Sequence, residues 1–157
     1  MDTLKFDFVF LGQSVLKYQV PLDIFSTINQ IYEQNFHNLE PANGQLVGKI
    51  ENEHSLFYQG QDQSKMKNHN MLTTNVTDYF MTVFKHYLAF NKIRDYETHL
   101  NSIWVNEMKQ HEYNPAHIHR GMLFTGLSSV MILKLPSTYG KEYSAEHIQQ
   151  NGRLQIL

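Results

Sequence analysis

The apolar pattern of this sequence changes its period near Asp95, and this change limits the folds that are open to the chain. Before Asp95, apolar residues recur at the three- and four-residue steps of amphipathic helices. After it, they come in short runs bounded by Gly, Pro and Asn, which is typical of β-strands. We therefore expect an α+β protein in which helices come first and a β-rich half follows.

Two helices are predicted in the first part. Pro21 stands where a first helical residue is favoured, and Asp23 falls in the first turn. The apolar residues that follow form one stripe, which predicts a helix over residues 21–36. A second stripe predicts a helix over residues 76–88, with an N-cap among residues 73–75. Its aromatic side chains favour packing against a sheet over a ligand-binding stripe.

Several strands are also predicted. Residues 4–10 and 15–20 alternate around a turn-like Gly12, which favours an N-terminal hairpin. Residues 38–70 are rich in polar side chains, so we expect a short strand or turn at 46–50 and an exposed loop at 59–70. After Asp95, strands are expected at 99–106, 127–135 and 148–157, with a turn at 113–119.

Length and composition bound the class of protein. A chain of 157 residues with 41% hydrophobic residues is long enough to bury the core of one domain. The net charge of -2 does not indicate a nucleic-acid-binding protein, which would usually carry an excess of Lys and Arg. The absence of cysteine excludes disulfides, thiolate metal sites and cysteine nucleophiles. We see no signal peptide and no membrane-spanning run, and expect a cytoplasmic protein.

His117 and His119 form the pattern with the clearest chemistry. Residues two apart on a strand share one face, so both imidazoles would point to the same side. Two neutral imidazoles bind a borderline divalent cation such as iron, zinc, copper or nickel. The alternative is a chance spacing, because the chain has nine histidines. For the other histidines we expect surface or hydrogen-bonded roles.

A family resemblance supports the metal site. It rests on Trp-Val-Asn at 104–106, Tyr-Asn-Pro-Ala-His-Ile-His at 113–119, the apolar run at 126–136 and the stretch 46–56. These segments resemble phage-encoded 2-oxoglutarate/iron(II)-dependent dioxygenases. The resemblance implies a double-stranded β-helix (jelly roll) with helices packed outside it, iron(II) as the metal and 2-oxoglutarate as co-substrate. For a phage-encoded protein the location would be the host cell cytoplasm.

The resemblance also implies site residues. His117 falls at the first metal-ligand position, and His119 falls where the family has a carboxylate. A His-x-His pair is more typical of cupins, which share the jelly-roll architecture, so a cupin-like metal protein is an alternative. Asn106 falls near a position that contacts 2-oxoglutarate, although a polar strand-end residue is the plainer interpretation. Lys134 is a candidate anchor for the far carboxylate of 2-oxoglutarate, and its alternative is a solvated lysine.

We expect a single domain over residues 1–157. Residues 1–95 would form the hairpin and a helical support region, and residues 96–157 the first part of a jelly-roll core. A jelly roll has eight strands, so we expect a fragment of a longer protein, strands supplied by another chain, or a protein that is no longer an enzyme. An open sheet edge predicts a homo-oligomer.

The resulting functional expectation is an iron(II)/2-oxoglutarate-dependent oxygenase, or a fragment of one. It would hydroxylate a small-molecule or protein substrate that the sequence does not identify. The alternative is a non-catalytic jelly-roll protein that serves a phage in binding or assembly.

Overall fold

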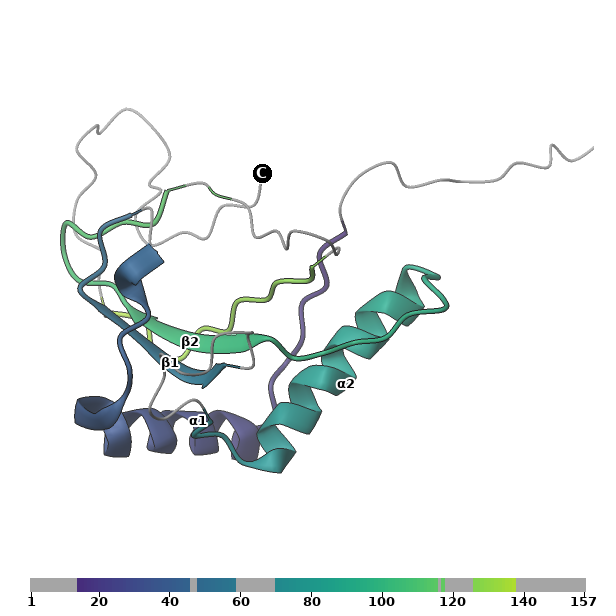
Figure 1. The fold of residues 1–157 in the computed structure, drawn as a ribbon, viewed down its shortest axis with the longest axis horizontal. Coiled ribbons are helices and arrows are strands. Elements are labelled where there is room, and N and C mark those ends of the chain that lie inside the picture. Colours follow the sequence, from purple (N-terminus) through teal and green to yellow (C-terminus); the bar gives the residue numbers. More distant parts are fainter. Residues whose placement is uncertain (1–13, 46–47, 59–69, 116, 118–125, 138–157) are drawn as a thin grey trace, which may run out of the picture.

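The computed structural model describes residues 14–45, 48–58, 70–115, 117 and 126–137. Along these residues the elements follow in the order α1, two 3-10 turns, β1, α2 and β2 (Figure 1). Their bounds are α1 Leu22–Asn35, η1 Phe36–Asn38, η2 Asn43–Gln45, β1 Asn52–Tyr58, α2 Thr74–Phe90 and β2 Ser102–Glu107. The protein is α+β, as the change of period predicts.

Both predicted helices are confirmed. Helix α1 begins directly after Pro21, whose ring fixes φ near the value a helix needs. It buries Ile24 and Ile28 from the apolar stripe. Helix α2 follows Thr73 as its N-cap residue and buries one residue near each end, Val76 and Leu88.

The sheet consists of β1 and β2, which pair antiparallel. The register places Glu53 opposite Asn106 and His54 opposite Val105, and a bulge follows Ser55. Strand β1 was not predicted, because its first residues are polar and two of them, Glu53 and Ser55, are buried. Alternation of apolar and polar residues therefore gives no signal there. The sheet joins a strand from residues 1–95 to one from residues 96–157.

Several predicted strands are corrected by the structure. Residues 15–20 form no strand, so the second half of the predicted hairpin is wrong. Residues 127–135 also form no strand, although Met131 and Leu133 pack against the core. An apolar run gives strand-like periodicity without a neighbouring strand to pair with. The other predicted strands, at 4–10 and 148–157, and most of the loop at 59–70 lie outside the described residues. Across the described ranges the sheet has two strands, and a jelly roll is not shown.

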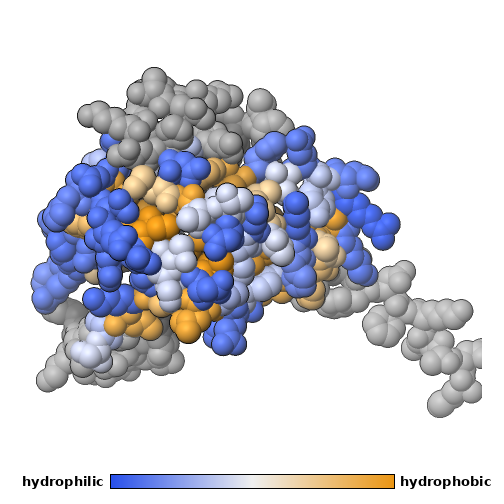
Figure 2. Space-filling view, turned by 90° about the horizontal axis from the view of Figure 1, so that it is seen from below, coloured by the Kyte–Doolittle hydropathy of each residue, from blue (hydrophilic) through white to orange (hydrophobic). Residues whose placement is uncertain are grey.

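The hydrophobic core lies between the helices and one face of the sheet (Figure 1). The His54 ring lies 4.8 Å from the Phe36 ring and 6.3 Å from the Tyr32 ring, so this face of β1 packs against α1. The view from the helix side shows hydrophobic patches between hydrophilic side chains (Figure 2). The buried members of the core are Ile24, Ile28, Leu39, Leu56, Phe57, Leu72 and Val76.

The two long edges of the sheet differ. On the outer edge of β1, the Ala42 amide donates to the Glu53 carbonyl (2.8 Å) and the Ser55 amide to the Glu40 carbonyl (2.9 Å). Strand β2 has no second strand partner within the described ranges. Neither of the two described helices is long and apolar enough to span a membrane.

Candidate functional site

The candidate site begins with a turn that is bound to the segment ahead of β1. Lys49 and Tyr113 exchange two backbone hydrogen bonds of 2.9 and 3.0 Å. The Glu112 carboxylate accepts from the backbone amides of Glu51 (2.9 Å) and Lys109 (2.6 Å). Three of these bonds hold residues 109–115 against residues 48–51, and the fourth, from the Lys109 amide, closes the turn itself.

Gly48 allows the two segments to approach this closely. A Cβ atom at Gly48 would lie 2.2 Å from the Tyr113 carbonyl oxygen and 2.9 Å from the Asn114 Cα atom. Both are backbone atoms, which cannot rotate away as a flexible side chain can. The turn therefore requires glycine at this position, because the two segments pack too closely to leave room for a side chain.

The two amide donors act on the Glu112 carboxylate. They favour its ionised form and lower the pKa of Glu112, with the Lys109 amide as the larger cause and the Glu51 amide next. Glu112 is partly buried, and burial, which raises its pKa, is a smaller cause than either amide. Its role is to tie the two segments together.

His117 follows this turn and is exposed. Its Nδ1 atom lies 2.7 Å from the Pro115 carbonyl oxygen. A carbonyl can only accept, so Nδ1 carries the hydrogen of this bond and the neutral ring has its lone pair on Nε2. Metal-binding histidines are commonly oriented in this way, by a hydrogen bond from the other ring nitrogen.

Glu53 is the unexpected member of the site. Its residue is only 7% exposed, and the Oε2 atom is buried with no hydrogen-bond partner. Burial raises the pKa of Glu53, and the nearby charge of His117 partly offsets that rise.

Asn106 lies on the same side of the sheet as Glu53. The two residues are direct cross-strand partners, and directly opposed residues point their side chains to the same face. Asn106 is exposed. A further buried oxygen without a hydrogen-bond partner, Oδ1 of Asn114, belongs to the turn that precedes His117.

Of the predicted site residues, the structure pairs Asn106 with Glu53 across the sheet, and the charge of His117 contributes to the pKa of Glu53. It does not do so for Lys134, which is exposed and lines a pocket otherwise formed by Leu133 and α1 residues. His119 lies outside the described residues. Sequence reasoning missed Glu53, because nothing in its spacing links it to His117.

Two donors are not a complete metal site. Within the described ranges, no group of three or more His, Cys, Asp or Glu side chains is placed to hold a metal ion. His117 contributes a nitrogen and Glu53 an oxygen. This mixed donor set suits iron, zinc, manganese and similar divalent cations.

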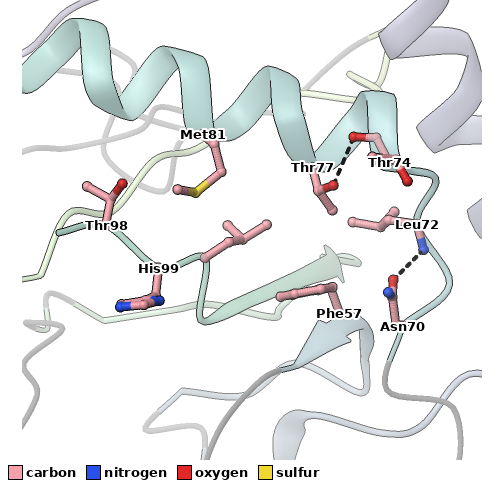
Figure 3. Close-up of a pocket in the computed structure, with 9 residues that line it drawn as sticks. Phe57, Asn70, Leu72, Thr74, Thr77, Met81, Thr98 and His99 are labelled. Carbon is pink, nitrogen blue, oxygen red and sulfur yellow. Dashed lines mark hydrogen bonds between the residues drawn. The ribbon is translucent and has the colours of Figure 1, made fainter.

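Two pockets lie elsewhere on the molecule. One of about 300 Å³ is formed between the start of α2 and the chain leading into β2, and His99 points to its rim beside Thr98 and Met81 (Figure 3). The other, of about 460 Å³, runs along α1. Neither is lined by Glu53, Asn106 or His117.

No protein family, no curated protein and no solved structure matches this chain. The chemistry of the site must therefore be argued from its own residues.

Proposed function

We propose that the chain is an iron(II)/2-oxoglutarate-dependent oxygenase that hydroxylates an organic substrate, with His117 and His119 as metal ligands and a jelly-roll architecture in the complete fold. The observation that carries the proposal is the buried carboxyl of Glu53, which lies opposite Asn106 in the sheet and whose pKa, raised by burial, is partly lowered by the charge of His117. It adds an acidic oxygen donor to a histidine pattern that lacked one.

His117 has the orientation that is common for a metal-binding histidine. His117 has its Nδ1 hydrogen bonded to the Pro115 carbonyl, so Nε2 carries the lone pair that a cation requires. When bound, iron(II) with open coordination positions would supply the oxygen chemistry. The protein would orient the reactants: the Asn106 amide would hydrogen bond to a 2-oxoglutarate carboxylate. Lys134, the other expected contact, lines a separate pocket along α1 and has no part in this arrangement.

The test is iron-dependent conversion of 2-oxoglutarate to succinate by the purified chain. We expect turnover in the wild type and its loss in His117→Ala. The matched control is His99→Ala, an exposed histidine that pairs with Glu97 at 3.3 Å and lies at a different pocket. Equal activity in both variants, or no iron uptake by the wild type, would refute the proposal.

A second candidate function is a non-catalytic binding or assembly protein that forms homo-oligomers. It is favoured by the apolar run at 127–135, where Val130, Ile132 and Leu135 are 62%, 52% and 59% exposed. The outer edge of β2 also has no strand partner within the described ranges. Sedimentation velocity over a range of concentrations tests it. The double variant Val130→Asp with Ile132→Asp should dissociate an oligomer built on this run, and a monomeric wild type would exclude it.

A further inference from the structure

The α2 cavity, which is the pocket of about 300 Å³ at the start of α2, lies against the hydrophobic core (Figure 3). Two core residues, Phe57 and Leu72, line it, and each of them is 8% exposed. Protein interiors are packed closely and contain few voids larger than a water molecule. The volume of this cavity instead falls at the lower end of the range for small-molecule pockets. It is therefore large enough for a small organic molecule.

Hydrogen bonds among the lining residues hold one end of the α2 cavity in shape (Figure 3). The Asn70 side-chain oxygen accepts from the Leu72 amide at 3.1 Å. The Thr77 hydroxyl donates to the Thr74 carbonyl at 2.9 Å. These bonds use the oxygen of Asn70 and the hydrogen of Thr77. The Asn70 side chain therefore keeps its amide hydrogens for a ligand, and Thr77 keeps the lone pairs of its oxygen.

Polar side chains lie at both ends of the α2 cavity (Figure 3). Thr74 and Asn70 are at one end, and Thr98 and His99 are at the other. The Met81 side chain points from α2 into the space between the two ends. A methionine adapts its shape to apolar and aromatic groups that pack against it. The cavity thus has an apolar middle between two groups of hydrogen-bonding side chains.

The charge of the lining limits the kind of ligand. None of the described residues that line the α2 cavity is Lys, Arg, Asp or Glu. The His99 Nε2 atom lies 3.3 Å from a carboxylate oxygen of Glu97, so this imidazole already has a partner outside the cavity. A charged ligand would lose hydration here without gaining an opposite charge. The lining therefore favours an uncharged molecule.

We propose that the α2 cavity binds a small uncharged molecule with an aromatic or other apolar body and a hydroxyl group at each end. The body contacts Met81 and the core residues, and the two end groups hydrogen bond to the hydroxyls of Thr77 and Thr98. This site is separate from that of His117, and its test needs no metal. The inference therefore stands or fails independently of the proposed oxygenase activity.

The probe is para-hydroxybenzyl alcohol, and its binding is followed by NMR of protein with ¹³C-labelled methionine methyl groups. We expect a saturable shift of the Met81 methyl signal, with a dissociation constant of about 1 mM, as for a ligand of this size. The Met108 methyl is the internal control, because Met108 is 53% exposed and lines neither described pocket. Benzyl alcohol lacks one end group and should bind about 2–10-fold more weakly, which is the contribution of one neutral hydrogen bond.

Two threonines of α2 give a matched pair of variants. Both hydroxyls donate to a backbone carbonyl of the preceding turn, that of Thr77 at 2.9 Å and that of Thr82 at 2.8 Å, but only Thr77 lines the cavity. Thr77→Val should weaken binding of the probe about 2–10-fold. Thr82→Val should bind the probe as the wild type does. Should Thr77→Val not fold, Thr98→Val replaces it at the other end of the cavity, with the same expected loss.

Three results would overturn the proposal. The first is the absence of a saturable shift of the Met81 methyl signal in the wild type. The second is an equal affinity for the two alcohols, which would show that the end groups make no contact. The third is an unchanged affinity in the variant that lacks a lining hydroxyl, which would leave only nonspecific contact with the apolar middle.

Discussion

Each face of the β1–β2 sheet carries one glutamate, and the surroundings of the two side chains differ. On the helix side, Glu107 is exposed, yet its carboxylate accepts from Asn52 and from the Tyr32 hydroxyl. On the other side, Glu53 is buried, yet its Oε2 atom has no hydrogen-bond partner. Stability alone would favour the reverse, with the buried acid paired and the exposed one solvated. The buried Oε2 atom of Glu53 is therefore a feature that folding alone does not explain.

The same contrast appears in the titration of neighbouring groups. Burial raises the pKa of Tyr32 to about 12, with further contributions from the charge of Glu107 and its hydrogen bond. Tyr32 thus stays a neutral donor, and the pair is a stable structural contact. The pKa of Glu53 is also raised by burial, but its only charged neighbour of consequence is His117, which acts in the opposite direction. Both faces carry buried polar atoms without a hydrogen-bond partner, Oε2 of Glu53 on one and the two ring nitrogens of His54 on the other, but only Glu53 is an acid.

The largest effect is expected from a substitution that removes the core on the helix side. Phe57→Ala deletes a buried ring that lies opposite Ile103 in the sheet. We expect a loss of about 3–5 kcal/mol in the free energy of unfolding, because the cavity adds to the lost transfer energy. Urea unfolding measures it. The exposed Ile132→Ala should change stability by less than about 0.5 kcal/mol, and equal effects of the two substitutions would contradict the placement of the core.

The second prediction concerns the turn that carries His117. Gly48→Ala places a methyl group against backbone atoms of Tyr113 and Asn114, so the two segments must separate. We expect a loss of about 1–3 kcal/mol, typical of overpacking. Gly44→Ala is the control, because a Cβ there meets nothing within 4 Å. If the turn positions the site, Gly48→Ala should also weaken Co²⁺ binding, whereas Gly44→Ala should leave it unchanged.

The sequence predicts the two helices but not strand β1, and the burial of individual residues explains the difference. The helices could be predicted because their burial follows the helical period, as at Ile24, Ile28 and Val76. Strand β1 could not, because burial at Glu53 and Ser55 runs against residue polarity. The run 127–135 has the pattern of a strand, but a strand also needs a partner, which periodicity does not report.

The candidate site was predictable in part for a similar reason. Asn106 and His117 belong to recognisable local patterns, and the structure relates both of them to Glu53. That relation depends on the register of β1 with β2 and on the Lys49–Tyr113 pair. Both are long-range contacts, and no local pattern of residues encodes them. Whether His119 joins the site remains a prediction.

A third, smaller effect tests the cost of the buried acid. At pH 7, Glu53→Gln should gain about 1 kcal/mol of stability, since an ionised carboxylate costs more to bury than a neutral amide of the same shape. The raised pKa gives the sign: the contribution of Glu53 to stability is full below its unfolded value of about 4.5 and is lost as pH rises through the folded pKa. The advantage of the variant should therefore shrink as pH falls toward 4. A pH-independent difference would show that charge is not its cause.

The smallest effect is expected at Glu112, whose contribution to stability depends on pH in the opposite direction to that of Glu53. Glu112 has a lowered pKa because it accepts from the Lys109 and Glu51 amides. Its contribution is therefore present above the unfolded pKa and lost as pH falls through the folded one. Glu112→Gln should destabilise the turn at neutral pH and have little effect in acid. Because the residue is only partly buried, the change is best measured locally, as faster hydrogen exchange at the amides of Glu51 and Lys109. Unchanged exchange at both amides would show that Glu112 does not hold the turn, and that the backbone pair Lys49–Tyr113 does so without it.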